Sequence, residues 1–164
     1  MCNNKPSQTS NIQEILSGHI CPYCGRQTEL IDSAEVYNGT SYGLMYICRP
    51  CDAYVGCYKN TSKSLGRLAN ARLRALKHAA HSVFDLIWKN GFIERFDAYT
   101  WLSQQLGTER ELTHIGMYDE EQCKQVIEVS RKFLLEKDEA YFSPIINDLH
   151  LEQLLQGDQD DSKN

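Results

Sequence analysis

Cys21-Pro22-Tyr23-Cys24 and Cys48-Arg49-Pro50-Cys51 are the two stretches that decide the fold of this 164-residue chain. Each has the C-x-x-C spacing of a metal-binding knuckle, and 23 residues (25–47) separate the two pairs. This pattern matches a tetrahedral structural zinc site, because each short turn can present two thiolates to one ion. Four thiolates complete the coordination sphere, so zinc held there would stabilise the fold without acting as a Lewis acid. The predicted cofactor is zinc, and its predicted ligands are Cys21, Cys24, Cys48 and Cys51.

Other uses of cysteine fit the same pattern less well. A redox-active pair or an iron–sulfur cluster would use the same residue type at similar spacing. Disulfides need an oxidising compartment, yet no secretory signal opens the sequence and the cysteine count of 7 is odd. Zinc in a reducing compartment is therefore favoured, and we expect a soluble, cytoplasmic protein.

The other three cysteines and one histidine have separate interpretations. Cys57 and Cys123 lie at apolar positions and are expected to be small buried side chains. Cys2 belongs to a polar start that is expected to be disordered. His19 precedes the first ligand by two residues, so it could replace a ligand or support one, although an exposed side chain is favoured.

Three strands are expected around the knuckles. Residues 30–37 and 42–47 are rich in Ile, Val, Tyr and Leu, and Asn38-Gly39-Thr40-Ser41 between them predicts a hairpin turn. Residues 53–58 predict a third strand. The order knuckle, hairpin, knuckle, strand is typical of a zinc ribbon, whereas a helix directly after Cys51 would indicate a treble clef.

Helical periodicity begins after the ribbon. The apolar residues of 64–89 fall on one side of a helical wheel, with Thr61 or Ser62 as a cap and Gly91 as a stop signal. Further helices are predicted over 94–106, ending at Gly107, and from Asp119, with a weaker segment over 146–155. No Walker-type or dinucleotide-type glycine loop is present, so the sequence gives nucleotide hydrolysis no support.

The predicted fold class is therefore α+β, with an N-terminal zinc ribbon packed on a three- to four-helix region. We expect an N-terminal extension (1–18), the ribbon (19–60), the helical region (61–135) and a C-terminal segment (136–164). That last segment ends in an acidic tail expected to be disordered. No apolar run approaches the roughly 18 residues that a membrane span requires.

Charge is distributed unevenly along the chain. Residues 1–90 carry 10 Lys and Arg against 6 Asp and Glu, whereas residues 91–164 carry 7 against 16. Six cations fall within residues 59–77, which contain no acidic residue. Lysine and arginine beside exposed tyrosines can bind nucleic acid, although an acidic protein surface would suit the same charges. The candidate nucleic-acid contacts are Lys59, Lys63, Arg67, Arg74 and Lys77.

A polar stripe runs along the opposite side of the long helix. Arg67, Arg74, His78, His81 and Asp85 share this side, because steps of 7, 4, 3 and 4 residues each return close to one angle. The stripe could be a solvated face, a buried network in which His81 and Asp85 pair with Arg95, or a working site. As a working site it could hold a metal or exchange protons, but the glutamate of H-E-x-x-H is missing. The candidate polar site comprises His78, His81, Asp85, Arg95 and His114.

A family resemblance rests on these same residues. Several ordered segments resemble a family of uncharacterised bacterial and phage proteins: Cys21 to Gly25, Ser41 to Cys57, Leu65 to Ala69, His81 with Phe84-Asp85 and Trp88, Arg95 with Ala98 to Leu102, and His114 to Asp119. These proteins are called zinc-finger-containing domains of unknown function. The resemblance covers roughly residues 20–133 and implies a zinc site at the four cysteines, followed by a shared helical region. Because His81, Asp85 and Arg95 fall within its motifs, it favours a buried network or a site over a solvated face.

The sequence as a whole predicts a zinc-binding, non-enzymatic binding module. Nucleic acid is the first candidate partner, and an acidic protein surface is the second. The alternative from a different functional class is a small hydrolase or nuclease that uses His78, His81, Asp85 and His114. Such an enzyme would need an activating metal or a paired base, and the sequence shows neither clearly.

Overall fold

The computed structural model of the chain describes residues 8–156. Cys2 and the acidic tail beyond Gln156 lie outside these residues. The chain divides into two compact units, Met1–Ala71 and Arg72–Asn164. We call residues 8–71 the zinc unit and residues 72–156 the helical unit. Within this span, no helix combines the length and apolar character needed to cross a membrane.

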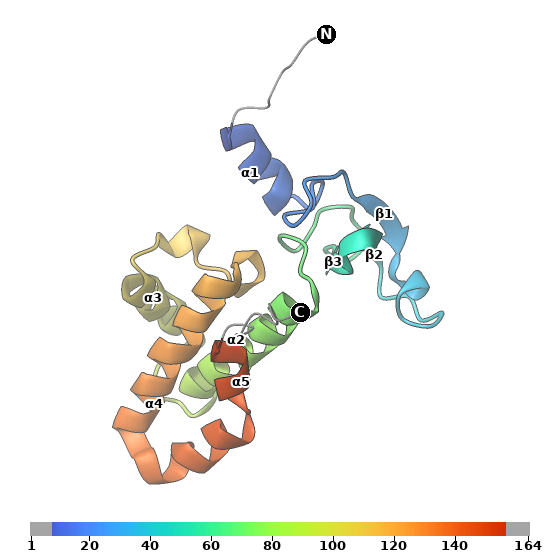
Figure 1. Ribbon diagram of the computed structural model, residues 1–164. Helices are drawn as coiled ribbons and strands as arrows, with labels where there is room; N and C mark the ends of the chain where they lie inside the picture. The colour runs from blue at the N-terminus through green and yellow to red at the C-terminus, as the bar shows by residue number, and fades with distance from the viewer. Residues whose placement is uncertain (1–7, 157–164) are drawn as a thin grey trace, which may run out of the picture. The chain divides into compact units, whose positions relative to one another are not determined.

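The zinc unit is built on a three-stranded antiparallel sheet (Figure 1). The strand order is β1-β2-β3, with Leu30 opposite Tyr46 and Tyr46 opposite Val55. This confirms the α+β class and the order of knuckle, hairpin, knuckle and strand. The elements are α1 (Gln8–Leu16), β1 (Glu29–Asp32), the 3-10 turn η1 (Ser33–Glu35), β2 (Leu44–Cys48), the 3-10 turn η2 (Arg49–Cys51) and β3 (Ala53–Gly56).

The first strand is shorter than the sequence predicts. We expected it to continue through residue 37, but β1 ends at Asp32. The Asp32 carboxylate accepts a hydrogen bond of 2.8 Å from the Ala34 backbone N–H, which caps a 3-10 turn in place of further strand. A local side-chain hydrogen bond therefore outweighs the strand preference of the residues that follow.

Helix α1 was not predicted, because its segment is mostly polar. It ends at Leu16; Gly18, two residues later, has a φ of 82°, and the His19 N–H then bonds to the Glu14 carbonyl at 3.0 Å. A Cβ atom at Gly18 would lie only 3.0 Å from the Tyr46 ring. Glycine thus both terminates the helix and allows the backbone to approach the sheet.

The long helix begins seven residues later than predicted, at Ala71 and not at Ser64. Residues before it pair with the third strand: Ala69 and Tyr54 exchange two backbone hydrogen bonds, and Leu65 bonds to the Gly56 carbonyl. These contacts satisfy backbone groups that a helix would otherwise have paired within itself. The predicted caps Thr61 and Ser62 therefore start no helix, and Arg67 lies outside the helical stripe.

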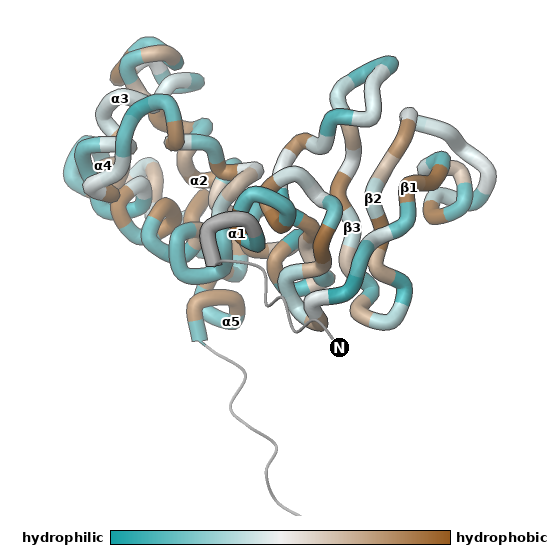
Figure 2. The backbone as a smooth tube through the Cα atoms, turned by 90° about the horizontal axis from the view of Figure 1, so that it is seen from above, coloured by the Kyte–Doolittle hydropathy of each residue, from teal (hydrophilic) through white to brown (hydrophobic). Residues whose placement is uncertain are grey.

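The helical unit contains three main helices around one apolar core. They are α2 (Ala71–Lys89), α3 (Arg95–Leu106) and α4 (Glu120–Asp148), joined by the 3-10 turns η3 (Arg110–Leu112) and η4 (Ile115–Met117) and followed by α5 (Leu151–Leu155). Aromatic contacts join Phe84 to Tyr99 between α2 and α3, and Trp101 to Phe133 between α3 and α4. In Figure 2, hydrophobic and hydrophilic colours alternate along these helices, as expected when one side of each is buried.

The predicted end of α3 and the predicted start of α4 are confirmed, and local signals set both. Gly107 closes α3 in a left-handed conformation, with a φ of 64°. Asp119 caps α4 in a capping box: its carboxylate accepts the Gln122 N–H at 2.9 Å, and the Gln122 side chain accepts the Asp119 N–H. At Asp138 the backbone leaves the helical conformation, and α4 bends there before continuing toward α5 (Figure 1).

We expect Asp119→Ala to lower the free energy of unfolding of the helical unit by about 1 kcal/mol, because the first turn of α4 loses a cap. Urea denaturation followed by circular dichroism would measure the loss. Glu121→Ala is the matched control, because it removes a carboxylate of the same turn that does not cap the helix. Equal stability of the two variants would show that the capping box contributes nothing.

Candidate metal centre

The first knuckle is a tight turn held by its own backbone. The Cys21 N–H donates to the Arg26 carbonyl at 2.8 Å, and the Gly25 N–H donates to the Cys21 carbonyl at 2.9 Å. Gly25 adopts a φ of 72° directly after Cys24. Residues without a side chain enter this left-handed region without strain, so the turn can bring both cysteines to the same side.

The second knuckle repeats this plan at the end of β2. Cys48 is the last residue of that strand, and η2 carries Pro50 before it ends at Cys51. The following residue, Asp52, takes the left-handed conformation with a φ of 45°, and its N–H bonds to the Arg49 carbonyl at 3.1 Å. Each cysteine pair is thus followed by one left-handed residue that redirects the chain.

The two knuckles bring four sulfur atoms together. The Sγ atoms of Cys21, Cys24, Cys48 and Cys51 all lie within 4.8 Å of one another. The Sγ atoms of Cys24 and Cys48 are 3.6 Å apart. Zinc–sulfur bonds of about 2.3 Å in a tetrahedron place sulfurs about 3.8 Å apart, so the cluster fits a zinc ion.

The pKa values of the clustered thiols depend on one another and on the surrounding backbone. The pKa of Cys24 is lowered to about 7, chiefly because the Arg26 backbone N–H donates a hydrogen bond to its sulfur. The pKa of Cys51 is raised to about 12, chiefly through its hydrogen bond with Cys24, and burial raises the pKa of Cys48. Four negative sulfurs at this spacing need a cation to balance their charge, and a divalent metal ion supplies it.

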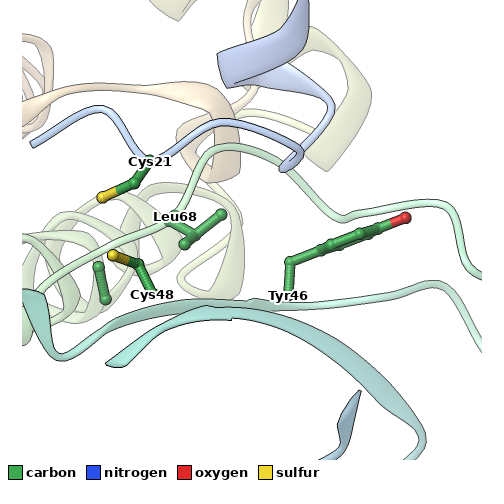
Figure 3. Packing of buried hydrophobic residues seen from close by; sticks show 5 residues of the cluster. Cys21, Tyr46, Cys48 and Leu68 are labelled. Carbon is green, nitrogen blue, oxygen red and sulfur yellow. The ribbon is translucent and has the colours of Figure 1, made fainter. Parts of the chain in front are cut away.

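A small apolar core surrounds two of the sulfurs. Cys21 and Cys48 point into one space beside Leu68 in Figure 3, and all three side chains are buried. Tyr46 belongs to the same core, and its hydroxyl donates to the Ser62 carbonyl at 2.9 Å. The segment after β3 therefore closes over the metal centre instead of starting the helix.

The remaining cysteines and His19 stand apart from this cluster. His19 is exposed, as expected; its Nε2 lies 3.2 Å from the Tyr46 hydroxyl, and it does not belong to the cluster. Cys123 is fully buried, which confirms the prediction for that residue, whereas Cys57 is only partly buried and packs against the edge of the apolar cluster. Burial raises the pKa of the Cys57 thiol.

The candidate nucleic-acid contacts are divided between the two units. Lys59 and Lys63 are exposed in the zinc unit, whereas Arg67 is partly buried and its Nε has no hydrogen-bond partner among the described residues. Arg74 and Lys77 lie on α2 in the helical unit and are partly buried. The Lys77 ammonium donates to the Gly116 carbonyl at 2.7 Å, so it already has a structural role.

The candidate polar site does not form the buried network that was considered. The His81 Nδ1 and the Asp85 Oδ1 are 3.8 Å apart, and the two side chains are 48% and 24% exposed. Asp85 also pairs with Lys89 at 3.4 Å and accepts a hydrogen bond from Trp88. Between residues 8 and 156, no ion pair joins Asp85 to Arg95, and the Arg95 guanidinium lies over the rings of Trp88 and Tyr99.

The histidines of this site also do not assemble a second metal centre. His78 and His114 are both exposed, and His114 lines a cavity with Arg95. Within the part of the chain that the structure describes, only the four cysteines place three or more metal-ligating side chains close enough for one ion. Among these residues, His78, His81, Asp85 and His114 thus form no cluster of three metal-ligating side chains.

Arg110 and Phe96 line the same cavity and were not identified from the sequence. Arg110 follows α3 in a 3-10 turn, so no helical spacing connects it to Arg95. A tertiary contact brings them together: each guanidinium lies over the Tyr99 ring. Only the aromatic character of the 96–101 segment could have pointed to this cavity.

Comparison with known proteins agrees with the metal centre. A family model described as a zinc-finger-containing domain matches residues 17–133, which is more than half of the chain. No curated protein and no solved structure matches the chain significantly. The family description and the four clustered sulfurs together establish that this protein binds zinc.

Proposed function

The chain belongs to the family of zinc-finger-containing domains, and from this premise we propose that it is a non-enzymatic module whose zinc unit contacts nucleic acid. The four cysteine ligands complete the zinc coordination, so the metal would hold the unit in shape without taking part in a reaction. Reduced thiolates suit a reducing compartment, which makes the cytoplasm the proposed location.

One loop of the zinc unit carries this proposal. The Tyr58 N–H donates to the Lys63 carbonyl at 2.9 Å, and the Thr61 N–H donates to the Tyr58 carbonyl at 3.0 Å. The Thr61 hydroxyl accepts the Lys63 N–H at 3.2 Å. These bonds close residues 58–63 into a compact loop, so its side chains are presented with little loss of backbone freedom on binding.

The loop offers charge and an aromatic surface together. Lys59 and Lys63 are both exposed, and the Lys63 ammonium lies 5.5 Å from the centre of the Tyr58 ring. The Tyr58 side chain is 49% exposed. Lysines can neutralise backbone phosphates while a tyrosine stacks on a base, which is how many proteins bind single strands without reading their sequence.

The distribution of charge supports the same choice. No Asp or Glu occurs between residues 53 and 84. An acidic protein surface would also be attracted to these lysines and could bury the tyrosine, but a ring beside lysines is the arrangement on which bases of a single strand stack. Nucleic acid therefore remains the first candidate and an acidic protein the second.

We expect the double variant Lys59→Glu, Lys63→Glu to weaken binding to a single-stranded oligonucleotide and to flatten its salt dependence. Each lost phosphate contact should reduce the slope of log K against log salt by about 0.7. Fluorescence anisotropy at a series of salt concentrations measures both quantities. Tyr58→Ala should weaken binding without changing the slope, because stacking releases no counterions.

Lys132→Glu, Lys137→Glu is the matched control, since it makes the same change in net charge at two exposed lysines of the helical unit. This control should keep the wild-type slope. An unchanged slope in the zinc-unit variant, or no binding of single- or double-stranded DNA or RNA by the wild type at low salt, would contradict the proposal. The acidic-protein alternative would then be pursued.

A further inference from the structure

Aromatic rings and arginines alternate in a continuous stack within the helical unit. The Arg95 Cζ lies 5.4 Å from the Trp88 ring centre and 5.9 Å from that of Tyr99. The Arg110 Cζ lies 5.2 Å from the ring centres of both Tyr99 and Phe96. All four distances fall within the range of cation–π contacts, so rings hold both guanidiniums in place. We call these five residues the arginine stack.

The two arginines of the stack lack the partners that other arginines of this chain have. Neither Arg95 nor Arg110 forms an ion pair with a carboxylate of residues 8–156. The Nε of Arg110 is buried and has no hydrogen-bond partner within the same residues. Carboxylates do pair with other arginines: Arg49 with Glu29 and Glu35, Arg72 with Glu120, and Arg131 with Glu152.

Stacking on rings leaves the in-plane N–H groups of a guanidinium free to bind an anion. The buried Nε of Arg110 is costly to leave without a partner, and its positive charge and that of the exposed Arg95 repel each other, so an incoming anion would relieve both effects. The planar fork of arginine suits the oxygens of a phosphate, which it can bind through two parallel hydrogen bonds.

A cavity opens beside these donors. It is lined by Arg95, Phe96, Tyr99, Arg110 and His114, and its volume is about 460 Å³. No carboxylate lines it, and a volume of this size is typical of small-molecule sites. The Phe96 side chain is 72% exposed, so its ring offers a flat apolar surface at the same place.

From this arrangement we propose that the cavity binds a nucleoside phosphate, through a terminal phosphate on Arg95 and Arg110 and a base on Phe96. Two guanidiniums match the charge of a phosphate monoester, which approaches −2 at neutral pH, better than the single charge of a diester. His114 can donate a further hydrogen bond to the phosphate. A free mononucleotide and the 5′-phosphorylated end of a strand share this chemistry.

This proposal is independent of the zinc-unit loop, and its test can fail separately. Isothermal titration calorimetry with adenosine 5′-monophosphate should show binding, whereas adenosine should bind at least about tenfold more weakly. Arg110→Ala and Arg95→Ala should each weaken nucleotide binding at least about tenfold, because each removes a charged donor. Phe96→Ala should weaken both adenosine and its monophosphate.

Arg131→Ala is the control, since its guanidinium pairs with Glu152 outside the cavity. It should bind the nucleotide as the wild type does, and so should the Lys59→Glu, Lys63→Glu variant. Circular dichroism shows whether each variant is folded, and Arg110→Lys, which keeps the charge but loses the planar fork, should bind with intermediate affinity.

The two sources of the ligand are separated by comparing oligonucleotides. A 5′-phosphorylated single strand that competes with the mononucleotide, while its 5′-hydroxyl form does not, would identify a strand end. Competition by neither form would identify a free nucleotide. Two results would overturn the proposal: no binding of the mononucleotide or the phosphorylated strand at millimolar concentration, or equal binding by the wild type and Arg110→Ala.

Discussion

Removal of zinc by a chelator at neutral pH is expected to unfold the zinc unit while leaving the helical unit folded. The buried apolar cluster at the metal centre consists of Cys21, Tyr46, Cys48, Ala53 and Leu68, and two of these five are themselves zinc ligands. Such a core buries too little apolar area to fold alone. Structural zinc contributes about 10–16 kcal/mol of binding free energy to a small domain, so its loss should be decisive.

Hydrogen exchange measured by mass spectrometry would localise the effect. After chelation, backbone amides of β1, β2 and β3 should lose protection, whereas those buried in α2, α3 and α4 should keep it. Cys48→Ser should reproduce the result without chelator. Cys57→Ser is the control, because Cys57 lies outside the cluster and should leave the zinc content unchanged.

The same site should make the zinc unit less stable in acid. Zinc-bound thiolates carry no protons, whereas the thiols of the unfolded chain do, so the unfolded state binds more protons. The free energy of unfolding of the zinc unit must then rise with pH, and it must fall as the thiolates become protonated.

For the chelation experiment, unchanged hydrogen exchange in the β strands after zinc removal would contradict a structural role for the metal.

Phe84→Ala is expected to destabilise the helical unit by about 3–5 kcal/mol. The Phe84 side chain is fully buried on α2, and its ring packs on Tyr99 with the ring centres 4.9 Å apart. Truncation removes that contact and leaves a cavity that its neighbours can fill only in part. A loss of this size is a large fraction of the 5–15 kcal/mol that stabilises a typical domain.

Urea denaturation followed by circular dichroism would measure the change, since most of the helix belongs to this unit. Phe96→Ala is the matched control: the same atoms are deleted from a side chain that is 72% exposed, and a change of at most about 1 kcal/mol is expected from the lost contact with Arg110. Equal losses in the two variants would show that Phe84 is not part of the core.

Features set by short-range signals were predictable from the sequence. The two knuckles depend only on the C-x-x-C spacing and on the left-handed residue that follows each pair. The end of α3 at Gly107 and the start of α4 at Asp119 likewise depend on residues within one turn. Each of these interactions joins neighbours in the chain, so composition and spacing are enough to locate it.

Features that depend on distant partners were not predictable in the same way. Leu65, Leu68 and Ala69 continue the apolar period of α2, yet their segment pairs with β3 and Leu68 packs beside the cysteines. No local pattern distinguishes these two outcomes, because both bury the same side chains. The tertiary contact with the third strand decided between them.

The candidate polar site illustrates the same limit. Pairing of Arg95 with Asp85 was a reasonable expectation, since buried charges need partners. In the structure Arg95 lies over Trp88 and Tyr99, and its companion is Arg110, which no motif connected to it. Rings are alternative partners for a guanidinium, and sequence spacing does not reveal which one is used.

Four cysteine sulfurs are expected to hold one structural zinc ion in this protein. X-ray absorption spectroscopy at the zinc edge, combined with elemental analysis of the purified protein, tests it most directly. We expect one zinc per chain with four sulfur neighbours at about 2.3 Å. A zinc content well below one per chain, or a first shell containing nitrogen or oxygen, would contradict it.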